Sequence, residues 1–292
     1  MSDLQTLVAE PWADWGLLDC GNGEKLERYG SVTVVRPEPQ AMWAPALDRW
    51  DPDATFVPAS DEEGGGRWVQ NRAVEPQWEL ARGNVRFHAS LTPFRHLGFF
   101  PDMAPQWDWM RELAANAEVL NLFGYTGVGT LLLSEAGARL VHVDASKKSV
   151  EAGKENARLS GMADRQIRWI VDDASKFTAR EVRRGRRYDG ILLDPPKFGR
   201  GPEGEVWRLE ENLAPLLADC RRLLDGDSRF LVLTVYAVRM SALAIGELVK
   251  QTFGDLGGTV EFGEMAVREE ARGLLLPTAI FARWRGPSFG TP

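Results

Sequence analysis

The sequence predicts an α/β protein with a Rossmann-like, mostly parallel sheet and a small β-rich domain before it. An apolar run at residues 119–123 enters a glycine-rich turn that opens a helical pattern. Strand and helix patterns then alternate as far as residue 253, whereas residues 12–90 show strands and turns with little helical periodicity. We therefore expect a β-rich N-terminal domain over residues 1–90 and the parallel sheet within residues 91–292.

The glycine turn predicts a site for a nucleoside without a pyrophosphate. A dinucleotide fingerprint requires G-x-G-x-x-G/A, but Leu132 stands where the third small residue belongs after Gly127 and Gly129. Asp144 closes the next apolar run and can accept hydrogen bonds from a ribose diol. The common cofactor of this kind is S-adenosylmethionine. A tight turn without a ligand remains the alternative interpretation.

Composition narrows the class of protein. The chain has 292 residues, 44% of them hydrophobic, which suits one large or two modest domains. It shows neither a leader pattern nor an apolar run of about 18 residues, so we expect a soluble, cytoplasmic protein. The cysteines, Cys20 and Cys220, and three scattered histidines lack metal-ligand spacing, and we expect no metal. Walker and G-x-S-x-G motifs are absent.

Neither the charge nor the aromatic residues decide whether RNA is a partner. The net charge of −7 opposes long-range attraction to a polyanion. A cluster of five arginines between residues 180 and 187 forms either a phosphate groove or a solvated helix end. Exposed tryptophans could stack on bases, but large aromatics more often pack a small domain. Eight of the 11 tryptophans precede residue 110: Trp12, Trp15, Trp43, Trp50, Trp68, Trp78, Trp107 and Trp109.

In the N-terminal domain, Gly21-Asn22-Gly23 predicts a hairpin that follows the strand Trp15–Asp19. Prolines between residues 37 and 58 interrupt any long element, residues 61–66 read as an exposed loop, and two more strands are expected near 78–81 and 85–89. Residues 94–102 join the domains. Their aromatics and Arg95 either close over the cofactor or pack as a plain linker.

The second domain continues as strand and helix. The patterns predict helices over 146–160, about 205–224 and 242–253, and strands over 167–171, 188–193, 230–235, 259–265 and 279–284. Cys220 falls on the apolar stripe of the second helix and is therefore expected in the core. The last two strands, joined through Gly273, suggest an antiparallel edge, which is typical of methyltransferase sheets.

Acidic residues follow several strands, and the carboxyl ends of parallel strands share one edge where ligands bind. Each acid alone could instead cap a helix. We expect Asp144 to bind the ribose and Asp172 or Asp173 to accept from the adenine amino group. The predicted cofactor-binding residues are Phe123, Gly124, Tyr125, Thr126, Gly127, Asp144, Ala145, Ser146, Asp172, Asp173 and Asp194.

The segment Asp194-Pro195-Pro196-Lys197-Phe198 predicts the chemistry. The lone pair of an exocyclic amine on a base is delocalised, so its two N–H bonds need acceptors that localise it. The Asp194 carboxylate and the Pro195 carbonyl can serve, since two prolines fix the turn, and Phe198 could stack on the base. We therefore name Asp194, Pro195 and Phe198 as catalytic. A rigid Pro-Pro turn is the structural alternative.

Four segments together resemble the S-adenosylmethionine-dependent methyltransferases related to the bacterial large-subunit ribosomal RNA cytosine-C5 enzymes: residues 121–127, 143–146, 172–173 and 194–198. Residues 97–102 are similar to the cofactor-side loop of that group. The resemblance covers about residues 90–240 and implies a methyltransferase fold, the same cofactor and an RNA substrate. Residues 1–90 do not look like the RNA-binding domain that those enzymes usually carry.

One departure from that group bears on mechanism. The related enzymes place a cysteine just after the fifth strand, where its thiolate adds to C6 of cytosine. This chain has Thr234-Val-Tyr-Ala237 there, while Cys20 is expected in a turn and Cys220 in a core stripe. Cytosine-C5 chemistry is therefore disfavoured, and direct in-line transfer to nitrogen suits the residues present.

The sequence thus predicts a cytoplasmic S-adenosylmethionine-dependent methyltransferase that acts on a nucleobase amino group in RNA, with ribosomal RNA favoured. A small-molecule or protein methyltransferase is the first alternative and fits the acidic charge better. The second is a non-catalytic binding module that retains the cofactor pocket. No membrane or metal partner is expected, and the sequence leaves the oligomeric state open.

Overall fold

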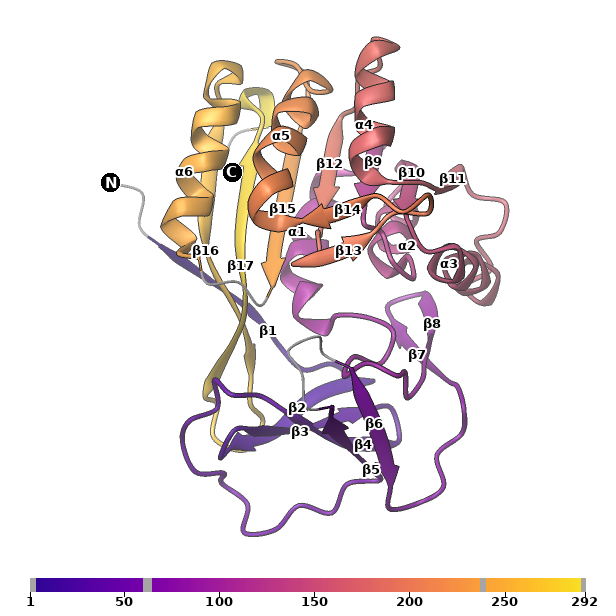
Figure 1. The fold of residues 1–292 in the computed structure, drawn as a ribbon, viewed down its shortest axis with the longest axis vertical. Coiled ribbons are helices and arrows are strands. Elements are labelled where there is room, and N and C mark those ends of the chain that lie inside the picture. Colours follow the sequence, from indigo (N-terminus) through magenta and orange to yellow (C-terminus); the bar gives the residue numbers. More distant parts are fainter. Residues whose placement is uncertain (1–3, 60–64, 237–239, 290–292) are drawn as a thin grey trace. The chain divides into compact units, whose positions relative to one another are not determined.

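The computed structural model describes residues 4–59, 65–236 and 240–289 (Figure 1). It divides into two compact units. The sheet unit comprises Met1–Leu7, Gln106–Met265 and Ala279–Pro292, and the N-terminal unit comprises Val8–Pro105 and Ala266–Thr278. The domain boundary at residue 90 stays a prediction.

The sheet unit contains the predicted Rossmann-like sheet. Its eight strands lie in the order β1-β16-β17-β15-β12-β9-β10-β11. Strands β15, β12, β9, β10 and β11 are parallel to their neighbours in this series, and β17 pairs antiparallel with β15, which confirms the mixed edge. Their bounds are β1 (Gln5–Ala9), β9 (Glu118–Leu122), β10 (Arg139–Asp144), β11 (Ile167–Val171), β12 (Gly190–Leu193), β15 (Phe230–Tyr236), β16 (Thr259–Arg268) and β17 (Leu275–Arg285).

Helices cover the sheet, and Figure 1 shows α4, α5 and α6 side by side over one face. The helices are α1 (Ala104–Leu113), α2 (Val128–Glu135), α3 (Lys147–Leu159), α4 (Ala174–Arg183), α5 (Leu209–Arg222) and α6 (Ala242–Phe253), with short 3₁₀ turns η1 (Pro101–Met103), η2 (Gly254–Leu256) and η3 (Pro287–Phe289). Leu120 and Leu122 of β9 pack in one core with Leu213, Leu217 and Cys220 of α5. Cys220 is therefore a core residue, as predicted.

Strand register brings the carboxyl ends of the parallel strands to one level. Leu122 at the end of β9 pairs with Leu193 of β12 on one side and with Val143 of β10 on the other. The residues that follow these strands therefore emerge together at the same edge of the sheet. This edge carries the glycine turn and the acids predicted to form the site.

The helix predicted from about residue 205 begins only at Leu209, so that boundary was wrong. Residues before it form a hairpin of β13 (Phe198–Arg200) and β14 (Val206–Arg208). Val206 and Arg208 are exposed and Trp207 is buried, which is the two-residue period of a strand. In Figure 1 the hairpin lies at the end toward which the arrows of β12 and β15 point.

The N-terminal unit is β-rich, as predicted. A five-stranded sheet has the order β2-β3-β4-β5-β6, and β7 and β8 form a separate antiparallel pair. The bounds are β2 (Trp15–Gly21), β3 (Glu24–Tyr29), β4 (Val32–Pro37), β5 (Ala54–Pro58), β6 (Gly66–Gln70), β7 (Trp78–Arg82) and β8 (Val85–Ala89). Asn22 and Gly23 adopt φ angles of 53° and 81° in the predicted hairpin between β2 and β3. Of the predicted loop at 61–66, residues 61–64 lie outside the described residues.

The position expected for Cys20 was wrong. It lies within strand β2 rather than in a turn, and it is buried. Its thiol lies 3.3 Å from the Glu269 carboxylate, and burial together with this contact raises the pKa of Cys20 to about 12. The strand extends past Asp19 because Cys20 and Gly21 continue the pairing with β3.

The tryptophans of the N-terminal unit are buried or half-buried, which supports packing over base stacking. Five of them donate their indole N–H to acceptors inside the unit: Trp12 to Ala81, Trp43 to Cys20, Trp50 to Asp19, Trp68 to Thr92 and Trp78 to Tyr29. In the linker segment, the Phe99 ring is buried and lies 4.7 Å from that of Phe87. This packing corresponds to the linker alternative.

Candidate functional site

The glycine turn after β9 is held in an unusual backbone conformation. Phe123, Tyr125 and Gly127 have φ angles of 60°, 49° and 78°. Left-handed backbone costs a residue with a side chain roughly 1–2 kcal/mol, so surrounding contacts must impose it at Phe123 and Tyr125. The Gly124 amide donates to Val143 across 3.0 Å and the Gly127 amide to Gly124 across 3.0 Å. Such imposed strain is characteristic of ligand-binding turns.

Asp144 supplies much of that constraint. One carboxylate oxygen accepts from the Tyr125 amide at 2.8 Å and the other from the Ser146 amide at 2.8 Å. Burial raises the pKa of Asp144, while these two hydrogen bonds favour its charged form. A carboxylate has about four acceptor positions, so each oxygen can still accept a further hydrogen bond. Asp144 therefore shapes the turn and retains the capacity to bind hydroxyl groups.

Buried polar residues that were not predicted from the sequence support the glycine turn from inside the protein. The Thr130 hydroxyl accepts from the Asn121 amide at 2.8 Å and lies 2.9 Å from Nδ1 of the buried His142. Since the hydroxyl oxygen already accepts, its proton is available to His142 Nδ1. From α3, the buried Asn156 donates to the Thr126 carbonyl at 3.0 Å. Polar residues inside an apolar strand or helix pattern were the signal that could have identified them.

Two of the three glycines are required by neighbouring side chains. A Cβ at Gly124 would lie 2.4 Å from the His142 ring, and one at Gly129 would lie 2.9 Å from the Trp107 indole nitrogen. Protein atoms rather than a ligand occupy the space beside these two glycines. At Gly127 the left-handed φ itself favours glycine.

The acids after β11 engage helix α4. Asp173 caps the helix by accepting from the Lys176 amide at 2.9 Å, which is the capping role considered above. Asp172 accepts from the Arg180 side chain. Both acids lie beside the end of β10, since the Asp172 amide donates to the Asp144 carbonyl at 3.1 Å.

The Asp194 to Phe198 segment leaves β12 at the same edge. Asp194 is half-buried, Pro195 is buried, and the Phe198 side chain is 51% exposed. The Pro196 carbonyl accepts from the Trp207 indole at 2.7 Å, and the Lys197 carbonyl from the Leu209 amide at 3.0 Å. In the part of the chain that the structure describes, no donor is placed on the Pro195 carbonyl.

Trp207 connects this segment to the glycine turn. Besides its hydrogen bond to Pro196, its ring packs against Phe123, with 4.9 Å between centroids. Phe123 is the first residue of the glycine turn and follows β9, the neighbour of β12. One buried side chain thus fixes the two turns relative to each other. Sequence reasoning missed it because Trp207 was assigned to a helix.

These residues fit a nucleoside cofactor that lacks phosphate. Asp144 offers acceptors for a ribose, and neutral or acidic residues line the adjoining strand ends. The predicted members Ala145 and Ser146 follow directly, and Ser146 caps α3 by accepting from the Ser149 amide at 3.1 Å.

The arginine cluster pairs with carboxylates, as a solvated helix end would. Arg180 contacts Asp172, Arg184 lies 2.9 Å from Glu181, Arg186 contacts Glu118, and Arg187 lies 3.9 Å from Asp225. These pairs leave little free charge for a phosphate groove. The described residues hold no helix long and apolar enough to cross a membrane and no His, Cys, Asp and Glu group suited to a metal ion.

The sheet order and its antiparallel edge define a Rossmann-like methyltransferase fold, and comparison with known proteins identifies the family. The chain belongs to the S-adenosylmethionine-dependent methyltransferase family, whose model matches residues 55–224. S-adenosylmethionine is accordingly its cofactor. A solved S-adenosylmethionine-dependent methyltransferase from Agrobacterium tumefaciens is 42% identical, with a TM-score of 0.91 over 98% of this chain and 96% of that one.

Curated relatives include ribosomal RNA methyltransferases. The large-subunit methyltransferase K/L of Syntrophotalea carbinolica is 31% identical over 146 residues, which are 50% of this chain. Methyltransferase K of Neisseria meningitidis is 22% identical over 245 residues, covering 80% of this chain and 68% of that protein. The chain spans only 20% of the length of the K/L proteins that it matches.

Proposed function

We propose that this enzyme transfers the methyl group of S-adenosylmethionine to an exocyclic amino group of a nucleobase in RNA, with ribosomal RNA favoured. The observation that carries the proposal is the Asp194-Pro195 turn, where the half-buried Asp194 carboxylate is followed directly by the Pro195 carbonyl, to which no described residue donates. Strand register sets this turn at the same edge as Asp144.

The chemistry follows from these two acceptors. The cofactor supplies an electrophilic methyl group on a sulfonium. Asp194 and the Pro195 carbonyl each accept one N–H of the amine, which localises the nitrogen lone pair and aims it along the line of transfer. The C–N bond forms as the C–S bond breaks, and the amine proton leaves to the Asp194 carboxylate or through it to water. Phe198 holds the base plane by stacking.

We assign the cofactor residues by their remaining acceptor capacity. Asp144 binds the ribose hydroxyls, and Phe123 through Gly127 lie along the methionine portion. Of the two acids after β11, Asp173 is the better acceptor for the adenine amino group. Its hydrogen bond to Lys176 uses one carboxylate oxygen, whereas Asp172 forms an ion pair with Arg180.

The cysteines support nitrogen rather than cytosine C5 as the acceptor. A C5 mechanism requires an accessible thiolate. Cys20 and Cys220 are both buried, and burial raises the pKa of each thiol well above its usual range. Of the segment after the fifth strand, Ala237 lies outside the described residues, and residues 234–236 complete β15.

An RNA substrate is supported by the ribosomal RNA relatives and would place the enzyme in the cytoplasm. The acidic net charge favours the alternative, a small-molecule or protein substrate. The test is incubation of methyl-labelled S-adenosylmethionine with separate RNA, protein and metabolite fractions. Label in RNA, recovered as an N-methylated nucleoside, supports the proposal. Label confined to another fraction, or label in none, rejects it.

A further inference from the structure

The β13–β14 hairpin presents one face with an unusual composition. Phe198 pairs with Arg208 and Arg200 pairs with Val206, so these four side chains project to the same side. All four are exposed, whereas the remaining pair, Gly199 with Trp207, faces inward. We call Phe198, Arg200, Val206 and Arg208 the hairpin face. Apolar and cationic side chains alternate along both strands.

Both apolar members are exposed to solvent. Phe198 is 51% exposed and Val206 is 48% exposed. Exposed apolar side chains grouped with cations can contact the bases of a nucleic acid. Phe198 directly follows the Asp194 to Lys197 segment, so the face begins where the acceptor base is proposed to lie.

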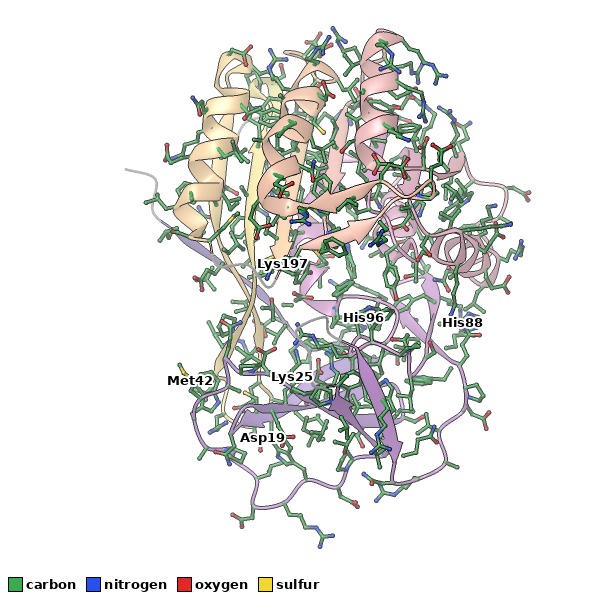
Figure 2. The ribbon with its side chains drawn as sticks, in the orientation of Figure 1. Asp19, Lys25, Met42, His88, His96 and Lys197 are labelled. Atoms are coloured by element: carbon green, nitrogen blue, oxygen red, sulfur yellow. The ribbon has the colours of Figure 1, made fainter. Side chains whose placement is uncertain are left out.

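The protein neutralises the charge of the cationic members only weakly. Arg200 forms no ion pair within the described ranges. Arg208 lies 3.6 Å from Glu211, but both side chains are mostly exposed and such a pair is weak. Lys197, exposed at the start of the hairpin, adds a third cation (Figure 2). This concentration of positive charge contrasts with the net charge of −7.

The hairpin is held as a fixed platform. Trp207 is buried and bonded to the Pro196 carbonyl. The turn of the hairpin is closed by the Gly201 amide, which donates to the Glu205 carbonyl at 2.9 Å. Lys176 of α4 contacts Glu203 at 2.9 Å and also contacts Glu205. These contacts hold the hairpin in place and do not involve the four side chains of the hairpin face.

We propose that the hairpin face binds the single-stranded RNA segment that flanks the target base. Phe198, which stacks on the target base, begins the face; Val206 contacts a flanking base, and Arg200 and Arg208 contact backbone phosphates, which is the combination that single-strand binding surfaces use. The inference rests on the proposed RNA substrate. Cations spread over both strands of a hairpin, next to exposed apolar side chains, match the alternating phosphates and bases of a single strand better than a small molecule does.

The test is the affinity of the full chain for a fluorescein-labelled single-stranded RNA, measured by anisotropy across a salt series. Arg200→Ala with Arg208→Ala should weaken binding and reduce the salt slope by about 1.4, from about 0.7 for each phosphate contact in single strands. Phe198→Leu should weaken binding roughly tenfold through lost stacking. The matched control is Arg165→Ala with Arg168→Ala, two exposed arginines at and before β11.

Two failures are distinguishable. If the wild-type chain binds and methylates RNA while the Arg200→Ala and Arg208→Ala double variant keeps its affinity and salt slope, the hairpin inference is wrong and the proposed function stands. If the wild-type chain neither binds nor methylates RNA, the proposed function fails and the inference with it. Calorimetry with S-adenosylhomocysteine checks folding. If the double variant loses its affinity for S-adenosylhomocysteine, the single Arg200→Gln variant is used instead. It should still weaken RNA binding and reduce the salt slope, and unchanged RNA binding would reject the hairpin inference.

Discussion

The indole N–H of Trp207 donates to the Pro196 carbonyl across 2.7 Å, and the same ring packs against Phe123. One side chain therefore sets the distance between the proposed acceptor turn and the cofactor turn. This contact explains how a hairpin that lies outside the strand and helix alternation contributes to the site.

Trp207→Phe should reduce kcat while leaving cofactor affinity unchanged. Phenylalanine keeps an aromatic ring against Phe123 but removes the donor to Pro196, and a net hydrogen bond of about 1 kcal/mol corresponds to roughly a fivefold loss. Trp284→Phe is the control, because it removes a similar bond to the Gly257 carbonyl at 2.8 Å elsewhere in the sheet unit. An equal loss in both variants would contradict a positioning role for Trp207.

Asp144→Ala should weaken cofactor binding. Hydrogen bonds to a charged group contribute about 1.5–3 kcal/mol, so the dissociation constant should rise roughly 10- to 150-fold. Titration calorimetry with S-adenosylhomocysteine measures it. Asp164→Ala, which changes an exposed carboxylate before β11, serves as the control. Unchanged affinity in Asp144→Ala would remove this residue from the cofactor site.

Stability should fall on mild acidification because of His142. Burial lowers the pKa of His142 to about 3, against a hydrogen bond to the Tyr125 backbone that raises it. Between this value and about 6.5, the unfolded chain binds a proton that the folded chain refuses, so stability decreases as pH falls. One such group removes about 2 kcal/mol between pH 7 and pH 5.

His142→Gln should remove that part of the pH dependence. The measurement is urea unfolding of both proteins at pH 7 and pH 5, with the difference between them assigned to the substituted residue. Equal loss of stability in variant and wild type would show that His142 titrates alike in the folded and unfolded chain.

The N-terminal unit contains a buried ion pair whose disruption should be costly. Arg36 Nε and Nη2 lie 2.7 and 2.8 Å from the carboxylate oxygens of Glu27, and both side chains are buried. Burial acts to raise the pKa of Glu27, but the charges of Arg36 and Lys25, together with hydrogen bonds from Arg36 and Tyr29, outweigh it and hold that pKa below its usual range. The pair therefore contributes stability above about pH 4.5 that is lost as pH falls through the lowered pKa.

Arg36→Met should destabilise the unit by about 3–5 kcal/mol, since it leaves Glu27 buried without its partner. Adding Glu27→Gln should recover part of the loss. Tryptophan fluorescence during urea unfolding measures both. A cost below about 1 kcal/mol in the single variant would mean that Glu27 finds water or another donor.

Much of the sheet was predictable because its signals are local. The apolar runs that end in Asp144 and Asp194 are buried strands, and buried parallel strands read directly from sequence. The Asn22-Gly23 hairpin follows from the left-handed backbone that those residues tolerate. The roles of the site residues remain proposals.

The features that the sequence did not predict depend on contacts between residues far apart in the chain. Trp207 reads as part of a helix until its hydrogen bond to Pro196, 11 residues before it in the chain, is known. Glu269 belongs by sequence to the last strands, yet it accepts from the Cys20 amide at 2.9 Å, 249 residues away, and so groups residues 266–278 with the N-terminal unit. Neither partner is marked by spacing or composition.

The central claim is tested most directly by Asp194→Ala under single-turnover conditions, with methyl-labelled cofactor, the RNA fraction that wild type labels, and S-adenosylhomocysteine affinity measured in parallel. We expect methyl transfer to fall at least a hundredfold while cofactor affinity changes less than about threefold, because Asp194 is proposed to act on the acceptor amine. Transfer at the wild-type rate would contradict the account.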